Sequence, residues 1–344
     1  MKIGILTGGG DAPGLNAAIR AVGRRALTHG ESLVAIRNGW AGLLGESDMA
    51  PMHRPAFSGI LQLGGTVLGS SRVNPMKREG GLEEVLRNFA RHGLDALVAI
   101  GGDDTLSVAA WLAERGAPVV GVPKTMDNDL SVTEYCIGFD SAVSVVTEAL
   151  DRLHTTAMSH HRVMVLEVMG RDTGWVGVMG GMAGGADMII IPEFPVTVDE
   201  VVDHLSRRKQ AGSDFSIIVV TEGVEMEGMP SKEEAVGGRD AFGHVQLGRR
   251  AVGETLARII EERTGNETRA TVLGHVQRGG SPSAYDRIWA TRVGAAAYDL
   301  VAARRWGEMP VVKCGAVAYA SIAEVVAETR RVPRDLYELA QVFY

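Results

Sequence analysis

The chain has few cysteines, no long apolar stretch and no excess of positive charge. Each of these absences excludes a class of protein. Its two cysteines, Cys136 and Cys314, lie far apart and form no CxxC pair, so we expect buried core thiols in a reduced compartment. No apolar run reaches the roughly 18 residues that suggest a membrane-spanning helix. The chain opens directly on an apolar strand rather than on a signal peptide, so we expect a cytoplasmic protein.

The balance of charge is mildly acidic. The chain has 35 Lys and Arg against 42 Asp and Glu, a formal net charge of −7. Non-specific nucleic-acid binding needs a basic face, so we expect no nucleic-acid partner. A small anionic substrate remains compatible with this charge, because nearby arginines determine the local field.

Glycine is abundant where other features are scarce. The 344 residues include 44 glycines, about twice the usual share of roughly 7%. Many of them form pairs between periodic segments, as at 64–65, 101–102 and 279–280. Glycine pairs at strand–helix junctions let backbone amides approach an anion closely, so the pattern favours anion binding.

The periodic segments repeat a strand–loop–helix order, which predicts an α/β protein with two doubly wound Rossmann-like lobes. The length is also typical of about two domains. The glycine-rich loop 8–14 matches neither the Walker pattern nor a full GxGxxG and is a weak signal alone. We expect 225–244 to be a loop or insertion. Strands are predicted at 2–7, 32–36, 96–100, 117–122, 162–168, 187–192, 215–221 and 311–319, and helices at 15–29, 81–92, 106–115, 140–155, 175–183, 198–210, 245–263 and 284–301.

The segment 123–129 concentrates chemistry directly after a predicted buried strand. Asp127 and Asp129 are two residues apart, so an extended backbone would direct both carboxylates to the same side. One carboxylate could accept a proton while the other helps to hold a metal ion. A solvated loop is the alternative interpretation.

Two more acids and an arginine follow other predicted strands. Asp103 and Asp104 would begin a helix, where a cap contributes about 0.5–2 kcal/mol. Capping needs only one carboxylate, and the second adds repulsion unless Mg²⁺ or Lys124 lies near it. Arg72 follows Gly69-Ser70-Ser71, which would let a phosphate come close, although a solvated arginine is the alternative.

Six motifs occur in one order along the chain, and together they resemble the phosphofructokinase family from residue 2 to about 319. They are GGGDAPGLNAAIR (8–20), GGTVLGSSR (64–72), GGDDT (101–105), PKTMDND (123–129), MGRDTGW (169–175) and ETRATVLGHVQRGGSP (267–282). The resemblance implies a phosphoryl-donor lobe of 1–138 plus about 277–325. It implies a fructose 6-phosphate lobe of 139–276 plus about 326–344.

The resemblance also implies transfer of a phosphoryl group to the 1-hydroxyl of fructose 6-phosphate. Asp127 would be the general base. Asp103 would hold Mg²⁺ with help from Asp129, in a reaction that depends mainly on positioning and charge neutralisation. Thr125 would bind the transferring group, and Arg171 would offset its charge.

Further residues would bind the donor and the sugar phosphate by the same resemblance. The donor residues would be Gly10, Arg72, Asp104 and Lys124. The sugar-phosphate residues would be Thr125, Asp127, Arg162, Met169, Gly170, Arg171, Glu222, Arg269, His275 and Arg278. Arg162 and Arg269 would reach across from a neighbouring subunit, which implies a homodimer or homotetramer with shared active sites.

Two residues favour diphosphate over ATP as the donor. ATP-using family members usually carry glycine at the position of Asp104, and many carry it at that of Lys124. A carboxylate at 104 adds bulk and negative charge where a nucleotide's α-phosphate would lie, and Lys124 can pair with it. Val108 would weaken an adenine site as well. We therefore predict reversible transfer from diphosphate, with an ATP-dependent enzyme or a non-catalytic paralogue as the alternatives.

Other functions fit less well. GGDDT alone would also admit a lipid or NAD kinase, and a dehydrogenase would need an acidic residue after the second strand, where residues 36–38 are Ile-Arg-Asn. Arg20, Arg24 and Arg54 are similar to effector-binding arginines of allosteric relatives. His154 replaces an arginine there and 211–214 contains no lysine, so we expect weak or absent nucleotide control.

Overall fold

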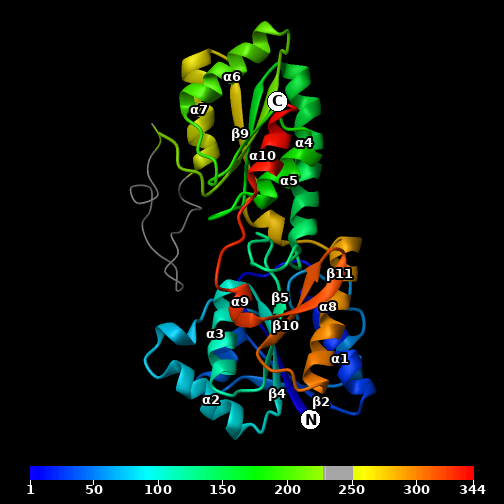
Figure 1. The fold of residues 1–344 in the computed structure, drawn as a ribbon. Coiled ribbons are helices and arrows are strands. Elements are labelled where there is room, and N and C mark those ends of the chain that lie inside the picture. The colour runs from blue at the N-terminus through cyan, green and yellow to red at the C-terminus, as the bar shows by residue number, and fades with distance from the viewer. Residues whose placement is uncertain (228, 230–250) are drawn as a thin grey trace. The chain divides into compact units, whose positions relative to one another are not determined.

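The chain folds into two compact units, which a computed structural model describes for residues 1–227, 229 and 251–344. Unit 1 comprises Met1–Ser141 and Arg278–Arg330, and unit 2 comprises Ala142–Gln277 and Arg331–Tyr344 (Figure 1). The predicted lobe boundaries at 138, 277 and 325 differ from these by five residues at most (330 against 325). Most of the predicted loop 225–244 and the start of the predicted helix 245–263 lie outside the described residues.

Unit 1 contains a five-stranded sheet with β1 at its centre. The strands are β1 (Lys2–Thr7), β2 (Ser32–Ile36), β3 (Met49–Met52), β4 (Ala96–Gly101) and β5 (Val119–Pro123), in the order β3-β2-β1-β4-β5. All pair in parallel except β3, which is antiparallel to β2 and was not predicted. Since β2 and β4 flank β1, the strand order reverses at β1, where doubly wound sheets place their ligands.

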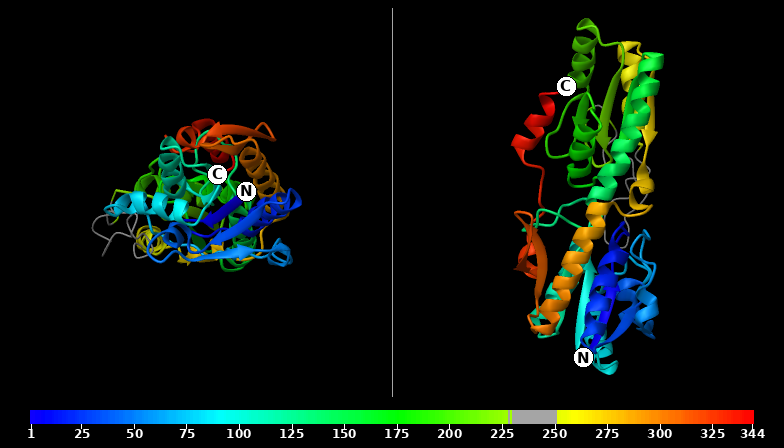
Figure 2. Two further views of the ribbon diagram at one scale, coloured as in Figure 1. Left: turned by 90° about the horizontal axis from the view of Figure 1, so that it is seen from below. Right: turned by 90° about the vertical axis from the view of Figure 1, so that its right-hand side faces the viewer.

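The helices of unit 1 are α1 (Leu15–Thr28), α2 (Gly81–Arg91), α3 (Asp103–Glu114), α8 (Ala284–Ala302) and the short α9 (Ile322–Val325). Figure 2 shows α1 and α8 side by side. α3 begins earlier than predicted, because Gly102 is its N-cap. Asp103 and Asp104 are therefore first-turn residues rather than caps, and the predicted capping role is wrong; their charge still favours the helix N-terminus.

The predicted strand at 311–319 is wrong. The segment forms an antiparallel hairpin of β10 (Glu308–Lys313) and β11 (Ala316–Ser321), which lies beside β5 (Figure 1). The chain reverses at Cys314 and Gly315, whose φ angles of 48° and 69° are those of a tight hairpin turn. Cys314 is exposed at this turn and only Cys136 is buried, so the expectation of two core thiols is half right.

Unit 2 contains a four-stranded sheet, and all its strands are parallel. The strands are β6 (Val163–Val168), β7 (Met188–Ile190), β8 (Ser216–Thr221) and β9 (Thr268–Val272), in the order β7-β8-β6-β9. Its helices are α4 (Phe139–His160), which starts in unit 1, α5 (Trp175–Ala183), α6 (Val198–Gln210), α7 (Val252–Thr264) and α10 (Arg334–Gln341). Every side chain of β6 is buried, as a central parallel strand requires. α10 was not predicted.

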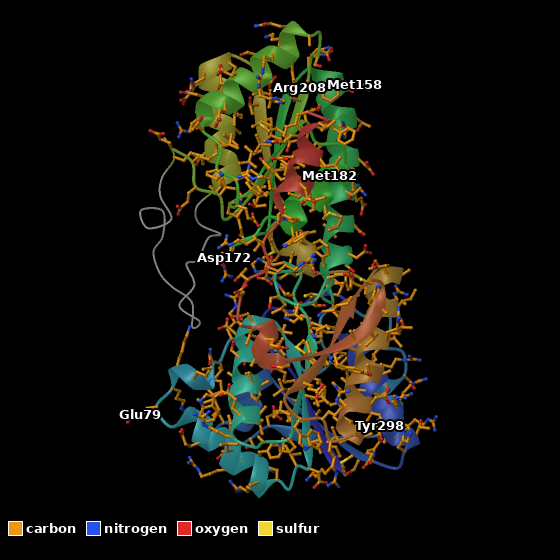
Figure 3. All side chains as sticks on the ribbon, in the orientation of Figure 1. Glu79, Met158, Asp172, Met182, Arg208 and Tyr298 are labelled. Atoms are coloured by element: carbon orange, nitrogen blue, oxygen red, sulfur yellow. The ribbon has the colours of Figure 1, made fainter. Side chains whose placement is uncertain are left out.

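The C-terminal segment protects the edge strand β7. The backbone N–H of Ile189 donates to the Tyr344 hydroxyl (3.0 Å), and the Tyr337 hydroxyl donates to the Ile189 carbonyl (3.0 Å). Burial raises the pKa of Tyr337 to about 12. Just before β7, Asp187 pairs with Arg208 at 2.7 Å. Arg208, which belongs to α6, is labelled in Figure 3. Exposed edge strands invite unwanted pairing, and these contacts satisfy the edge.

Candidate active site

The predicted donor residues gather at the carboxyl edge of the unit 1 sheet. Gly10 follows β1, Asp103 and Asp104 begin α3 after β4, and Lys124 and Asp127 follow β5. Because parallel strands end at one edge, three loops distant in sequence meet there. The charges of Asp127 and Asp129 act on Lys124, so these side chains are neighbours.

The backbone of 123–129 is not extended as predicted. It turns at Met126 and Asp127, and Asn128 has a left-handed φ of 51°. The Asn128 side chain stabilises this turn, since it accepts from the Cys136 backbone N–H (2.9 Å) and donates to the Glu134 carbonyl (3.2 Å). The carboxylates of Asp127 and Asp129 are nevertheless close, because the turn brings them together rather than strand alternation.

This turn concentrates negative charge. Burial, reinforced by the charge of Asp127 and more weakly by that of Asp103, raises the pKa of Asp129 to about 7. Thr125 moderates the effect through a hydrogen bond from its side chain, and it also accepts from the Asp127 backbone N–H (3.2 Å). A cation beside Asp129 would offset the negative charge that helps to raise its pKa.

The residues fit a loosely held Mg²⁺. Within the described part of the chain, no group of three or more His, Cys, Asp and Glu side chains could enclose a metal ion. Mg²⁺ does not need such a group, because it usually takes one or two carboxylates and completes its shell with water and phosphate oxygens. Asp103 and Asp129 can supply those carboxylates.

Lys124 is buried beneath the first glycine-rich loop. Its side chain is 3% exposed, and its Nζ donates to the Gly10 carbonyl at 2.6 Å. Burial lowers the pKa of Lys124 to about 8, and the charge of Arg278 adds to this. Asp104 Oδ1 accepts from Asn74 Nδ2 (3.5 Å), and the pairing of Lys124 with Asp104 stays a prediction.

Three consecutive carbonyls of the first loop accept bonds from three different segments. Ser70 Oγ donates to Gly9 (2.5 Å), Lys124 to Gly10 (2.6 Å) and Arg278 Nη1 to Asp11 (3.1 Å). A Cβ on Gly10 would lie 2.7 Å from Arg278 Nη1, so a side chain there would displace the guanidinium group. The loop conformation is therefore set by protein contacts. Arg278, predicted for the sugar phosphate, lies against the donor loop of unit 1.

The loop that carries Arg72 is held by a residue that the sequence did not single out. Asn16 Nδ2 donates to the Leu63 and Gly64 carbonyls (both 3.1 Å), and its Oδ1 accepts from the Val67 backbone N–H (2.8 Å). Arg72 is exposed at the end of this loop. By contrast, Val108 is fully buried in the unit 1 core, and its effect on an adenine site stays a prediction.

In unit 2 the predicted sugar residues meet at the carboxyl edge of the sheet. Met169, Gly170 and Arg171 follow β6, Glu222 follows β8, and His275 lies in the 3₁₀ turn Gly274–Arg278 after β9. The loop after β6 is tied at three points. Gln277 Oε1 accepts from the Met169 N–H (3.2 Å), Gly223 N–H donates to the Gly170 carbonyl (2.9 Å), and the Glu193 carboxylate accepts from the Gly174 N–H (3.0 Å).

Arg162 and Arg269 lie elsewhere in unit 2. Arg162 precedes β6 and Met169 follows it, so the six residues of β6 separate them by about 20 Å. Both arginines pair with Glu267 Oε1, at 2.7 Å and 2.6 Å. These bonds, above all the one from Arg162, hold the pKa of Glu267 below its usual value. One chain therefore does not place Arg162 beside Met169. The sequence reasoning missed Glu267, although it directly precedes Thr268-Arg269.

The residues considered for regulation make local contacts. His154 Nε2 donates to the carbonyl of Gly184 (2.8 Å), which ends α5. Burial lowers the pKa of Arg20, and the charge of Arg24 adds to the effect.

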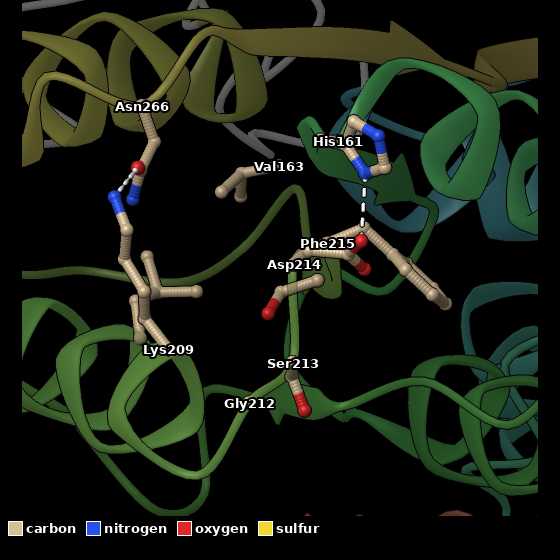
Figure 4. A pocket seen from close by; sticks show the side chains of 10 residues that line it. His161, Val163, Lys209, Gly212, Ser213, Asp214, Phe215 and Asn266 are labelled. Atoms are coloured by element: carbon tan, nitrogen blue, oxygen red, sulfur yellow. Dashed lines mark hydrogen bonds and ion pairs between the residues drawn. The ribbon is translucent and has the colours of Figure 1, made fainter.

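Residues 212–216, which overlap the segment 211–214, help to line a pocket of about 280 Å³ in unit 2 (Figure 4). In it Lys209 Nζ donates to Asn266 Oδ1 (2.9 Å), and His161 pairs with Asp214 (2.7 Å). The expected weakness of nucleotide control stays a prediction.

None of the described helices is both long and apolar enough to cross a membrane.

Comparison with known proteins shows the family. The phosphofructokinase family model matches residues 2–301. The pyrophosphate–fructose 6-phosphate 1-phosphotransferase of Amycolatopsis methanolica is 52% identical over 345 residues, with 100% of both chains covered. The ATP-dependent 6-phosphofructokinase 3 of Streptomyces coelicolor is 46% identical over 99% of both. The structure of Pichia pastoris phosphofructokinase superposes with a TM-score of 0.82 at 30% identity, covering 99% of this chain and 36% of that one. The α/β fold and the resemblance predicted from six motifs are confirmed: the chain belongs to the phosphofructokinase family.

Proposed function

We propose that the chain transfers a phosphoryl group reversibly from diphosphate to the 1-hydroxyl of fructose 6-phosphate. The hydroxyl oxygen forms a bond to one phosphorus, the bridging P–O bond of diphosphate breaks, and phosphate leaves. The products are fructose 1,6-bisphosphate and phosphate. The observation that carries the proposal is the loop after β5, which sets Asp127 beside Asp129 and the buried cation of Lys124.

Asp127 accepts the proton of the attacking hydroxyl. Its backbone N–H donates to Thr125 Oγ1 (3.2 Å), which fixes the backbone that carries the carboxylate. Burial and the charge of Asp127 raise the pKa of the neighbouring Asp129. Asp103, with Asp129, would hold Mg²⁺, which when bound supplies positive charge to the transferring phosphoryl group.

Asp104 and Lys124 select the donor. Asp104 lies half-buried in the first turn of α3, where it opposes the anion-binding tendency of a helix N-terminus. The Asp104 carboxylate repels the α-phosphate of a nucleotide. Diphosphate lacks that phosphate and can bind near Lys124, away from Asp104. The 52% identity to a pyrophosphate-using relative and the 46% identity to an ATP-using one agree with this choice.

A donor comparison tests the assignment. Purified protein is assayed for fructose 1,6-bisphosphate formation with diphosphate or ATP, and we expect faster turnover with diphosphate. Faster turnover with ATP would establish the ATP-dependent alternative. Asp104→Gly should relax selectivity toward ATP, while Asp151→Gly, on the exposed face of α4, serves as a control. If Asp104→Gly gains no ATP activity, residues other than 104 exclude the nucleotide.

The sugar-phosphate site is completed by a second copy of the chain. Met169, Glu222 and His275 stand at one end of the unit 2 sheet, and Arg162 stands about 20 Å away at the other. Following the family resemblance, we propose that Arg162 and Arg269 act in the site of a neighbouring subunit, in a dimer or tetramer. The cytoplasmic location stays a prediction from the sequence.

Complementation tests the shared site. Asp127→Ala and Arg269→Ala should each be nearly inactive alone, and co-expressed they should regain part of the activity. Recovery follows because a mixed oligomer contains one site with neither substitution. An active monomer by light scattering, or no recovery in mixed oligomers, would place all site residues in one chain.

A further inference from the structure

Gln277 joins two loops of unit 2 through a single side-chain amide. Its side chain is fully buried, with 0% exposure. Oε1 accepts from the Met169 backbone N–H (3.2 Å), and Nε2 donates to the Gly274 carbonyl (3.0 Å). The two partners are far apart in sequence, and each begins a loop that carries a proposed sugar-phosphate residue.

The amide fixes the spacing of these loops. Met169 opens the loop that continues to Arg171, and Gly274 opens the 3₁₀ turn that contains His275. A buried amide with no partner is costly, so the backbone groups it binds must stay within the span of one carboxamide. Gly274 adopts a φ of 46°, so the turn also starts from a conformation that favours glycine.

The next residue anchors the chain in the other unit. Arg278 belongs to unit 1, where its Nη1 donates to the Asp11 carbonyl of the donor loop (3.1 Å). The chain thus crosses from unit 2 to unit 1 between two residues whose side chains each hold loop backbone in their own unit.

We propose that Gln277 is a positioning residue of the acceptor site: it sets the distance between the Met169–Arg171 loop and His275 without touching the sugar. The proposal rests on the proposed function, because it assigns these two loops to fructose 6-phosphate. It predicts a selective effect on the acceptor. The donor loops of unit 1 are held by other contacts.

Two substitutions test this role. Gln277→Glu keeps the oxygen that accepts from Met169 and loses the donor to Gly274, and Gln277→Met loses both bonds at similar length. We expect the KM for fructose 6-phosphate to rise roughly fivefold in Gln277→Glu and by more than tenfold in Gln277→Met. The KM for diphosphate should stay within about twofold, and kcat should fall less than the KM for fructose 6-phosphate rises.

Asn88→Asp is the matched control. Asn88 is also a buried amide, 7% exposed, and donates to the Leu43 carbonyl (2.9 Å) in unit 1. It should lower the thermal midpoint and leave both KM values unchanged.

The outcomes separate cleanly. Equal rises in both KM values, or a loss of stability with both KM values unchanged, would make Gln277 a structural residue and overturn the proposal. So would failure of both variants to fold. If the wild type works with ATP instead of diphosphate, the donor assignment fails. The acceptor KM measured with ATP then decides the role of Gln277 on its own.

Discussion

The two units present carboxyl edges of different construction. In unit 1, Ser70, Lys124 and Arg278 bind consecutive carbonyls of one loop, and acids stand close by. In unit 2, a neutral amide joins two loops, and Arg162 and Arg269 lie toward the far end of the sheet. Unit 1 thus assembles the proposed donor residues in one chain, whereas unit 2 separates its proposed sugar-phosphate arginines from its other sugar residues.

The two edges differ in whether their charged side chains are buried or exposed. Burying an ammonium group is costly, which the lowered pKa of Lys124 records, and the acids around it recover part of that cost. Exposed arginines carry no such cost, and Arg269 is 52% exposed where it pairs with Glu267. Substitutions of buried charged groups in unit 1 should therefore change stability more than the loss of a neutral hydrogen bond at the edge of unit 2.

The largest effect should come from the base. Asp127→Asn should lower kcat by about 10²–10⁴-fold, since the amide cannot accept the hydroxyl proton. Binding of fructose 6-phosphate, followed by calorimetry, should change little. Asp151→Asn, exposed on α4, is the control and should keep full turnover. Near-normal turnover of Asp127→Asn would remove Asp127 as the base.

The next largest effect should fall on stability in unit 1. Asp286 is fully buried and accepts from the Tyr135 hydroxyl (2.5 Å), the Gly138 N–H (2.6 Å) and both the N–H and the hydroxyl of Ser141 (2.8 and 2.6 Å). In Asp286→Asn an NH₂ group would face these donors, so the free energy of unfolding in urea should fall by about 2–4 kcal/mol. Asp299→Asn, in a surface pair with Arg25, should cost under about 1 kcal/mol. Equal decreases in the free energy of unfolding for the two variants would mean that the buried hydrogen bonds of Asp286 contribute no more than a surface ion pair.

A pH series tests the buried cation. Folding lowers the pKa of Lys124 from 10.5 to about 8, so the folded state holds this proton less tightly than the unfolded state. The contribution of Lys124 to the free energy of unfolding should rise between about pH 8 and pH 10.5 and stay level below pH 8. Lys124→Met should lack this rise in urea unfolding at pH 7.5, 9 and 10. Parallel pH curves for both proteins would mean that the ammonium is not buried.

The smallest effect should appear at the edge of unit 2. Tyr344→Phe removes the hydroxyl that accepts from the Ile189 N–H, so the free energy of unfolding should fall by about 1 kcal/mol. Tyr285→Phe, at a tyrosine that is 49% exposed on α8, is the matched control and should leave stability unchanged. A loss as large as that of Asp286→Asn would show that the edges of the two units do not differ in the expected way.

Local structure followed from local pattern where the pattern was clear. The bounds predicted for β1, β2, α5 and α6 agree with the structure, because apolar periodicity and flanking glycines mark them. The hairpin of β10 and β11 was read as one strand, since Cys314 and Gly315 do not stand out within an alternating segment. The turn at Asn128 was missed because its stabilising contacts, at Glu134 and Cys136, lie beyond the motif.

The order of residues along the chain was enough to identify the family and to place Asp127, Asp103 and Arg171 directly after strands. It could not show that Lys124 reaches Gly10, that Gln277 binds Met169, or that Arg162 stands a strand's length from Met169. Those facts depend on which strands become neighbours and in what register, and the burial of many distant side chains together decides that.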